Sequence, residues 1–292
     1  MMKLFGKVHD TIVRDRWEIG FVKGGLDAIM SKPSIEIQWL KHNFKDRWFA
    51  DPFILDVTES DIFVLAEEYQ YSTNKGRIAE LVVDRDSCVL KELNIILELD
   101  THLSFPAIWR EKGQIFVYPE SWGSGALSLY EYRGRGQSLK QVKVLCDDSM
   151  ADAIMTERFG KKRLLSTKEN DRLRIYDYDV NDGKFVFSEE MDFGTATARN
   201  GGDFFEWEGW TYRPAQVCVN RYGEAVEIQK VWLDETGKFS FEPIKRFCSP
   251  HPKLNTGMHT LNTYKGVSVI DVHGWVNPRI VDLIIIMKKM FK

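Results

Sequence analysis

The sequence lacks several features that would place it in a familiar functional class. No apolar run reaches the length of about 20 residues that a transmembrane helix needs. The N-terminal stretch is interrupted by His9, Asp10 and Arg14, so it contains no apolar core of a secretory signal. The formal net charge is only −3, which gives no electrostatic support for nucleic-acid binding. We therefore expect a cytoplasmic protein without a nucleic-acid partner.

Cysteine is scarce, and the motifs of common cofactors are missing. The four cysteines are far apart and none forms a C-x-x-C pair, which argues against a zinc site or a disulfide framework. No G-x-G-x-x-G sequence follows an expected strand, so a dinucleotide fold is not indicated. No motif specifies a metal ion either. We predict no cofactor, and the use of a divalent cation stays open.

What the chain does contain is a recurring unit, first seen at Trp48–Phe53. A short strand start carries one or two polar residues and is followed by a turn, a more apolar strand, another turn and a third strand. The spacing of roughly 50 residues is that of a four-stranded propeller blade. The innermost strands are expected to begin near Asp51, His102, Asp152, Arg199 and His259. Five such units predict an all-β fold, a five-bladed β-propeller in one domain. The blades are expected at about 46–98, 99–147, 148–194, 195–245 and 246–276.

Both ends of the chain fall outside this repeat. The segments Trp17–Val22 and Ile35–Trp39 have the pattern of strands, and we expect them to complete the last blade and close the ring. At the other end, Asn277-Pro278 is typical of a helix start and leads into an apolar tail with lysines, residues 277–292. One interpretation is a short helix packed on the propeller. The other is an amphipathic anchor that contacts anionic lipid.

Carboxylates at equivalent places in the blades are the candidates for catalysis. Asp51 and Asp152 begin the innermost strands of blades one and three, so a ring would bring them together at its axis. Glu68 and Glu120 end the second strands of blades one and two. Glycosyl transfer requires one carboxylate as nucleophile or base and a second acid for the leaving group. The simpler interpretations are an Asp that caps a turn and a Glu at a solvated strand end.

Other polar residues near the expected axis are candidates for substrate binding. Arg199 precedes Gly201-Gly202, and a guanidinium beside flexible backbone suits a phosphate or carboxylate. The remaining candidates share a position near an inner strand: His102, Arg213, Gln216 and His259. A structural histidine or an ion pair between blades would explain the same residues without a ligand.

An ordered set of motifs resembles a known family. It comprises Ala50-Asp51-Pro52-Phe53, His102-Leu103-Ser104-Phe105-Pro106, Pro119-Glu120-Ser121, Asp152-Ala153, Gly201-Gly202, Arg213-Pro214-Ala215-Gln216, Tyr222-Gly223 and His259-Thr260-Leu261-Asn262. Together these resemble the N-terminal β-propeller domain of plant glucosamine inositolphosphorylceramide transferases, and its stand-alone bacterial relatives found with surface-polysaccharide genes. More distantly, the chain is similar to the five-bladed arabinanases, β-xylosidases and invertases.

The distant resemblance implies an Asp on blade one, an Asp on blade three and a Glu on blade four. Asp51 and Asp152 match the first two, but Arg199-Asn200-Gly201-Gly202 stands where the Glu is expected. Glu120 or Glu68 would then have to supply the acid. We accordingly expect a glycosyltransferase of cell-surface polysaccharide or glycolipid assembly, with a nucleotide-activated donor and a lipid-linked acceptor. A glycoside hydrolase and a non-catalytic sugar-binding propeller are the alternatives.

Overall fold

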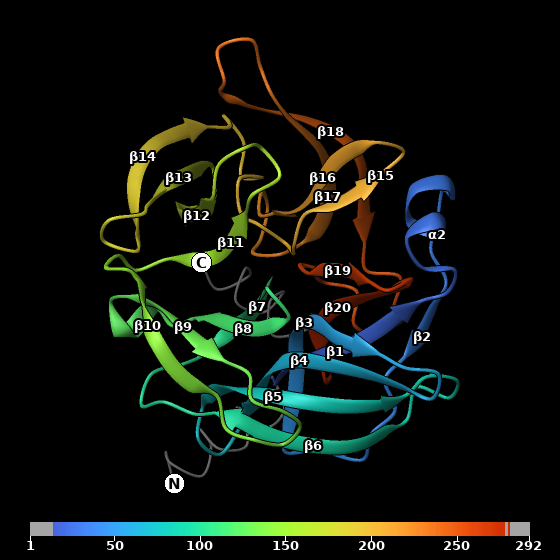
Figure 1. Ribbon diagram of the computed structural model, residues 1–292. Helices are drawn as coiled ribbons and strands as arrows, with labels where there is room; N and C mark the ends of the chain where they lie inside the picture. Colours follow the sequence, from blue (N-terminus) through green and yellow to red (C-terminus); the bar gives the residue numbers. More distant parts are fainter. Residues whose placement is uncertain (1–13, 278–279, 281–292) are drawn as a thin grey trace, which may run out of the picture.

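The computed structural model describes residues 14–277 and residue 280, and in this part of the chain five four-stranded antiparallel sheets surround one axis (Figure 1). The prediction of a five-bladed β-propeller is confirmed. Blade one consists of β3 (Arg47–Val57), β4 (Asp61–Gln70), β5 (Lys75–Asp84) and β6 (Leu90–Leu97). Blade two consists of β7 (Ser104–Glu111), β8 (Gln114–Glu120), β9 (Leu127–Glu131) and β10 (Lys140–Cys146).

The remaining blades follow the same order from the axis outward. Blade three consists of β11 (Ala151–Thr156), β12 (Arg163–Glu169), β13 (Arg172–Asp179) and β14 (Lys184–Asp192). Blade four consists of β15 (Phe205–Trp207), β16 (Trp210–Val217), β17 (Ala225–Leu233) and β18 (Phe239–Cys248). Blade five combines the two ends of the described chain: β19 (Leu261–Tyr264), β20 (Val267–Trp275), β1 (Asp15–Val22) and β2 (Ile37–Trp39).

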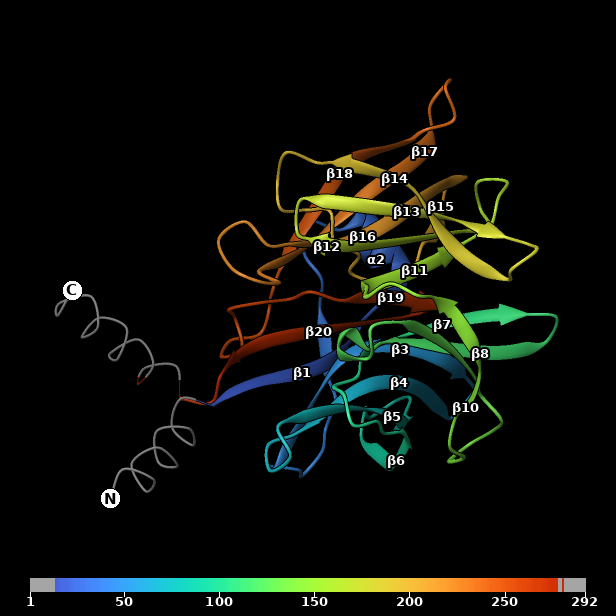
Figure 2. The same ribbon diagram turned by 90° about the vertical axis from the view of Figure 1, so that its left-hand side faces the viewer.

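Blade five closes the ring by pairing strands from opposite ends of the sequence. β1 pairs with β20 from Asp15 opposite Trp275 to Phe21 opposite Val269, and Figure 2 shows the two strands side by side. The buried Ile19 anchors β1, and burial of one such side chain stabilises the fold by about 1.5–3 kcal/mol. The expectation that the N-terminal segments complete the last blade is thus confirmed. Helix α2 (Gly25–Ser31) joins β1 to β2.

The C-terminal tail predicted over 277–292 lies outside the described residues, apart from Asn277 and the exposed Ile280. The two interpretations of this tail therefore stay predictions. Among the helices in the described part of the chain, none has the length and apolar character needed to cross a bilayer.

The starts of the innermost strands in the first three blades share one distortion. The strand register shifts between Ala50 and Phe53, between Ser104 and Ala107, and between Ala151 and Ile154. At each shift one residue has a left-handed backbone: Asp51 at φ 49°, Phe105 at φ 43° and Asp152 at φ 47°. A non-glycine residue in this region is strained by roughly 1–2 kcal/mol. Such a bulge changes the direction of a side chain, and here it places two carboxylates at the axis.

Candidate active site

A polar cavity of about 560 Å³ opens at one end of the propeller axis. Its walls contain acidic, basic and aromatic side chains from all five blades or the loops next to them. They are Asp15, Trp17, Trp48, Asp51, Glu67, Tyr69, His102, Ser104, Glu120, Asp152, Arg199, Arg221, Tyr222, Thr256, His259, His273 and Trp275. A larger groove of about 1030 Å³ lies between β2 and β6, but none of the predicted site residues lines it. The chemistry of the axial cavity makes it the candidate site.

Six of the nine predicted site residues lie around this cavity: Asp51, His102, Glu120, Asp152, Arg199 and His259. The other three, Glu68, Arg213 and Gln216, do not line it. Their positions follow from strand alternation and from packing within the blades, as described below.

Asp51 is held by residues from two neighbouring blades. Its Oδ2 accepts a hydrogen bond from the Phe105 amide at 3.1 Å, and its Oδ1 accepts one from the Thr260 hydroxyl at 2.8 Å. The side chain of His259 lies on the same oxygen, with Nε2 3.5 Å away. Burial raises the pKa of Asp51 to about 7, the His259 cation lowers it, and the negative charge of Glu67 raises it further. Asp51 is thus a carboxyl that can gain or lose a proton near neutral pH.

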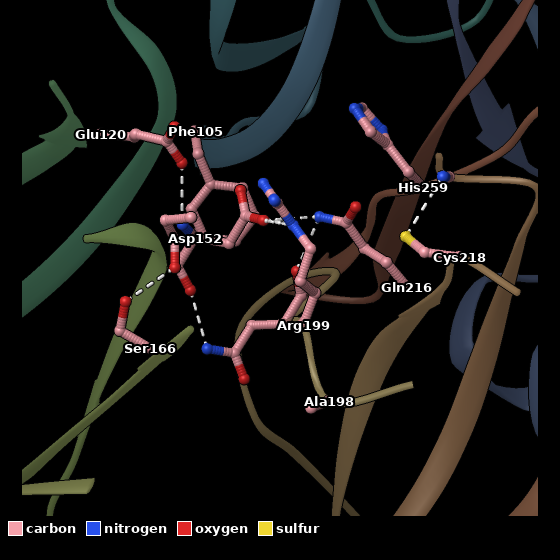
Figure 3. Close-up of polar contacts among 12 residues, drawn as sticks. Phe105, Glu120, Asp152, Ser166, Ala198, Arg199, Gln216, Cys218 and His259 are labelled. Carbon is pink, nitrogen blue, oxygen red and sulfur yellow. Dashed lines mark hydrogen bonds and ion pairs between the residues drawn. The ribbon is translucent and has the colours of Figure 1, made fainter. Parts of the chain in front are cut away.

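Asp152 lies between Glu120 and Arg199, as Figure 3 shows. Its Oδ2 accepts hydrogen bonds from Arg199 Nε at 2.6 Å and from Gln216 Nε2 at 2.8 Å. Gln216 therefore reaches the site from behind Asp152 and positions this carboxylate without touching the cavity. The pair Asp152–Arg199 is buried and charge-assisted, which is the strong form of a hydrogen bond.

Glu120 is a carboxyl whose surroundings favour its protonated form. Its Oε2 accepts a hydrogen bond from the Asp152 amide at 2.8 Å (Figure 3). In the pairing of β7 with β8, Glu120 lies opposite Ser104. Burial and the negative charge of Asp152 raise the pKa of Glu120 to about 8, while Arg199 acts in the opposite direction. The Asp152 carboxylate paired with Arg199, and the neighbouring Glu120 with its raised pKa, form the pattern of an acid–base site.

His259 is fixed by Asp271, which the sequence analysis did not select. Nδ1 of His259 lies 2.8 Å from Asp271 Oδ2, and the ring stacks on Trp17 with centroids 4.0 Å apart. Asp271 also accepts the backbone amides of Asp51, His259 and Thr260. Burial lowers the pKa of His259, but the charges of Asp271 and Asp51 outweigh this and raise it to about 9. His259 is thus a buried cation between two carboxyls.

Asp271 had a recognisable signal in the sequence. It follows Val267–Ile270 in the second strand of blade five, as Glu120 ends the second strand of blade two. In both cases the carboxylate accepts the amide of the bulged residue that begins the next blade. The rule that selected Glu120 would have found Asp271 if it had been applied to every blade.

Glu68 requires a correction, because its neighbour Glu67 lines the cavity in its place. Successive residues of a strand point to opposite faces, so only one of the two can face the axis. Glu68 is 0% exposed and forms ion pairs with Arg47 at 2.8 Å and Arg77 at 2.9 Å. Glu67 contacts His102, with Nε2 and Oε1 3.1 Å apart. The Gly76 amide donates to Nδ1 of the same ring.

Arg213 also lies away from the cavity, buried inside blade four. Its guanidinium donates to Asn200 Oδ1 at 3.0 Å, to Gln229 Oε1 at 2.6 Å and to the Ala198 carbonyl at 3.1 Å. Burial lowers its pKa to about 9. The arginine holds the start of blade four in place and does not face a ligand. Arg213 thus has a structural role, which was the alternative interpretation. Its partners are two side-chain amides and a backbone carbonyl, whereas the alternative had expected an ion pair between blades.

Among the described residues, one group of side chains has the spacing of a metal site, and it lies at the axis. Ligand atoms of Asp51, His259 and Asp271 lie within 4.8 Å of one another. In the structure, the three residues form ion pairs with one another: Asp271 contacts Nδ1 of the His259 ring, and Asp51 lies beside its Nε2. A metal would have to displace the proton of His259 from this arrangement, which the high pKa of the imidazole opposes.

Five blades around a cavity lined by carboxyls, a guanidinium and aromatic rings define a five-bladed β-propeller with a polar axial site. The chain belongs to the family described as "Glucosamine inositolphosphorylceramide transferase 1, N-terminal", whose model matches residues 32–249. It is 27% identical over 198 residues to glucosamine inositolphosphorylceramide transferase 1 of Arabidopsis thaliana, and the matched region covers 63% of this chain and 25% of the relative. The protein of the same name from Oryza sativa subsp. japonica is 26% identical over 202 residues, 64% of this chain and 27% of the relative. The chain thus spans about a quarter of the length of these curated relatives.

Solved structures support the fold. A β-xylosidase superimposes with a TM-score of 0.53 at 8% identity, over 78% of this chain and 92% of that chain. A GH43_1 enzyme from Xanthomonas citri gives a TM-score of 0.52 at 9% identity, over 79% of this chain and 88% of that chain. At such low identity these likenesses concern the architecture alone.

Proposed function

We propose that the axial cavity is the active site of a carbohydrate-active enzyme, a glycosyltransferase of cell-surface polysaccharide or glycolipid assembly. The observation that carries the proposal is the meeting of Asp51, Glu120 and Asp152 from three blades at one cavity, where the pKa values of Asp51 and Glu120 are raised and Asp152 is paired with Arg199. Transfer at an anomeric carbon needs an acid and a base or nucleophile on opposite sides of the sugar. The family's name, taken from a transferase, agrees with this class.

In this proposal each group has one role. Glu120, whose pKa is raised to about 8, protonates the leaving-group oxygen. Asp51, with a pKa of about 7, accepts the proton of the incoming hydroxyl. Asp152 holds Arg199, and its charge keeps Glu120 protonated. The rings of Trp17, Trp48 and Tyr69 offer apolar faces on which a sugar can stack.

Blade four favours transfer over hydrolysis. The segment Arg199-Asn200-Gly201-Gly202 stands where the resembling hydrolases would carry a glutamate, and none of its residues is acidic; Asn200 is its amide residue. Its side-chain amide is committed to the carbonyls of Asp152 and Leu165. The activated donor, the lipid-linked acceptor, a cytoplasmic location and contact of the tail 277–292 with the inner face of the membrane are parts of the same proposal.

Two rival functions have an observation in their favour. Glu120, with its raised pKa, beside the Asp152–Arg199 pair would also serve a glycoside hydrolase. A non-catalytic sugar-binding propeller is supported by Asp51, because both of its oxygens already accept hydrogen bonds within the protein. The three functions differ in what they release and in whether carboxyl substitutions stop it.

Turnover assays with carboxyl variants separate the functions. The purified chain is incubated with sugar nucleotides plus glycan acceptors, and separately with oligosaccharides, and products are identified by mass spectrometry. We expect glycosylated acceptor, and a loss of about 10²–10⁴-fold for Glu120→Gln, the usual contribution of a positioned general acid. Glu235→Gln, an exposed residue far from the axis, is the matched control and should retain full activity.

Free sugar released from oligosaccharides without any transfer would replace the transferase with a hydrolase. Saccharide binding without turnover, unchanged by Glu120→Gln, would leave a binding module.

A further inference from the structure

The cavity has two chemically different sides. Blades one and five contribute aromatic rings, among them Trp17, Trp48 and Trp275, together with Asp15. Blade four and its loop contribute two guanidinium groups, Arg199 and Arg221, and the ring of Tyr222. The aromatic side suits an uncharged sugar ring, whereas the arginine side suits an anion.

Arg199 uses only part of its guanidinium within the protein. Its Nε donates to Asp152, and the group lies 5.1 Å from the ring centroid of Tyr222. Within residues 14–277 and 280, the two terminal nitrogens of Arg199 make no hydrogen bond or ion pair. They therefore remain available to a ligand, in the fork geometry that pairs with phosphate and carboxylate oxygens.

Arg221 is the second cation on this side. It is exposed in the loop between β16 and β17, and it forms no ion pair or hydrogen bond with any residue of the described part of the chain. An exposed arginine without a carboxylate partner is ordinary on a surface, but this one lines the same cavity as Arg199. The net effect is a positive region at blade four.

The loop that carries Arg221 is held against the site. The Gly223 amide donates to Cys218 Sγ at 3.3 Å. Gly223 has φ 58°, and a Cβ there would lie 2.8 Å from the Cβ of His259. Tyr222, 51% exposed, packs edge-on against His259 with centroids 5.5 Å apart. The loop therefore presents Tyr222 and Arg221 in a fixed place over the cavity.

The neighbouring acids neutralise only part of this region. Asp152 balances the charge of Arg199 but occupies only its Nε, and the pKa of Glu120 is raised to about 8 by burial and by Asp152. His259 adds a further positive charge below its pKa of about 9, although Asp271 and Asp51 face it. An anion bound between Arg199 and Arg221 would lie near the protonated Glu120. It could accept hydrogen bonds from the terminal nitrogens of Arg199 and from the guanidinium of Arg221.

We propose that the substrate carries an anionic substituent, a phosphate or a carboxylate, that binds between Arg199 and Arg221 under Tyr222, while its sugar ring lies on the aromatic side of the cavity. The proposal rests on the proposed function, because it assumes that a saccharide occupies the axial cavity. It names the substrate class as an anionic sugar: either a glycosyl phosphate, including sugar nucleotides, or a uronic acid.

Isothermal titration of the full chain tests this assignment. The probes are sugar 1-phosphates of glucose, galactose and N-acetylglucosamine, the matching neutral sugars, glucuronate and galacturonate, and pyrophosphate without any sugar. We expect at least one anionic sugar to bind tenfold or more tightly than its neutral counterpart, because charge-assisted pairs to guanidinium are involved. Phosphate sugars binding alone would identify a phosphate, and uronates binding alone would identify a carboxylate; either result supports the anionic subsite.

Substitution then locates the subsite. Arg221→Gln should weaken the anionic sugar about tenfold and leave the neutral sugar unchanged, and Arg199→Lys should weaken it while keeping a cation near Asp152. Arg133→Gln, an exposed arginine in the loop between β9 and β10, is the matched control and should bind as the parent does. Equal affinity of neutral and anionic sugars, or an unchanged affinity of Arg221→Gln, would overturn the subsite while the proposed function survives. Binding of pyrophosphate without binding of any sugar would support the anion subsite and contradict the proposed function.

Discussion

Replacing Glu120 with glutamine should make the protein more stable at alkaline pH. The pKa of Glu120 is about 8 in the folded protein against an ordinary value of 4.5, because burial and Asp152 oppose its charge. A carboxyl with a raised pKa favours the fold fully below its unfolded pKa, and this contribution is lost as the pH rises through the folded pKa. The parent protein should therefore lose stability between about pH 4.5 and pH 8, whereas the glutamine variant keeps a neutral side chain throughout.

The size of this effect follows from the difference between the two pKa values. At 1.36 kcal/mol per pH unit, the whole difference corresponds to about 5 kcal/mol. Glu120 is partly exposed and its charge is coupled to Asp152 and Asp51, so we expect about 2–4 kcal/mol. Glutamine keeps an oxygen that can accept the Asp152 amide, so the hydrogen bond at 2.8 Å is preserved. The substitution thus isolates the charge from the packing.

Urea unfolding followed by tryptophan fluorescence provides the measurement. The free energy of unfolding of the parent and of Glu120→Gln is determined at steps from pH 5 to pH 9. Asp51 and His259 also titrate in this range, but they contribute to both proteins and largely cancel in the difference. We expect the difference to grow with pH in favour of the variant, with Glu235→Gln following the parent. Parallel curves for parent and variant would refute the claim that Glu120 is protonated near neutral pH.

Three further substitutions test the roles of individual residues. Asp271→Asn should lower the pKa of His259 from about 9 toward 6.5, because the carboxylate that stabilises the imidazolium is lost; NMR titration of the imidazole measures this pKa, and an unchanged value would contradict the ion pair. Glu68→Gln should destabilise the protein by about 3–5 kcal/mol, because Arg47 and Arg77 lose a buried partner, and it should leave ligand affinity unchanged. A loss of affinity without destabilisation would show that Glu68 belongs to the binding site. Gly223→Ala should weaken ligand binding more than it lowers the melting temperature, since the added Cβ meets His259 and shifts Tyr222; wild-type affinity would show that the loop is adaptable.

The architecture was predictable because each blade repeats one pattern. Polar strand starts at Asp51, Asp152 and His259 identified the axis, and the alternating segments before residue 40 identified the strands that close the ring. Because the same pattern occurs five times, a wrong assignment at one residue does not change the predicted number of blades. The tail beyond Asn277 and the catalytic roles of the site residues stay predictions.

The errors within the site have two physical origins. A shift of one residue along a strand moves a side chain to the other face, and the bulges at Asp51, Phe105 and Asp152 introduce such shifts. Glu67 and Glu68 could not be told apart from the sequence for this reason. Arg213 had the composition of a ligand contact, but its partners Asn200 and Gln229 are brought together only by the folded blade.

Arg221 and Tyr222 belong to a loop, whose position over the cavity depends on Gly223 and His259. Loop geometry has no periodic signal, so the sequence marked Tyr222-Gly223 only through the family resemblance. The loop is therefore where the structure adds most to the prediction of the site.

The location of a bound saccharide tests the central claim most directly. A crystal of the full chain soaked with the tightest-binding anionic sugar should show density in the axial cavity, with the sugar ring near Trp17 and Trp48, its anionic group at Arg199 and its reactive carbon next to Glu120. Density in the groove between β2 and β6, or on the outer surface of a blade, would contradict the assignment of the axial cavity as the active site.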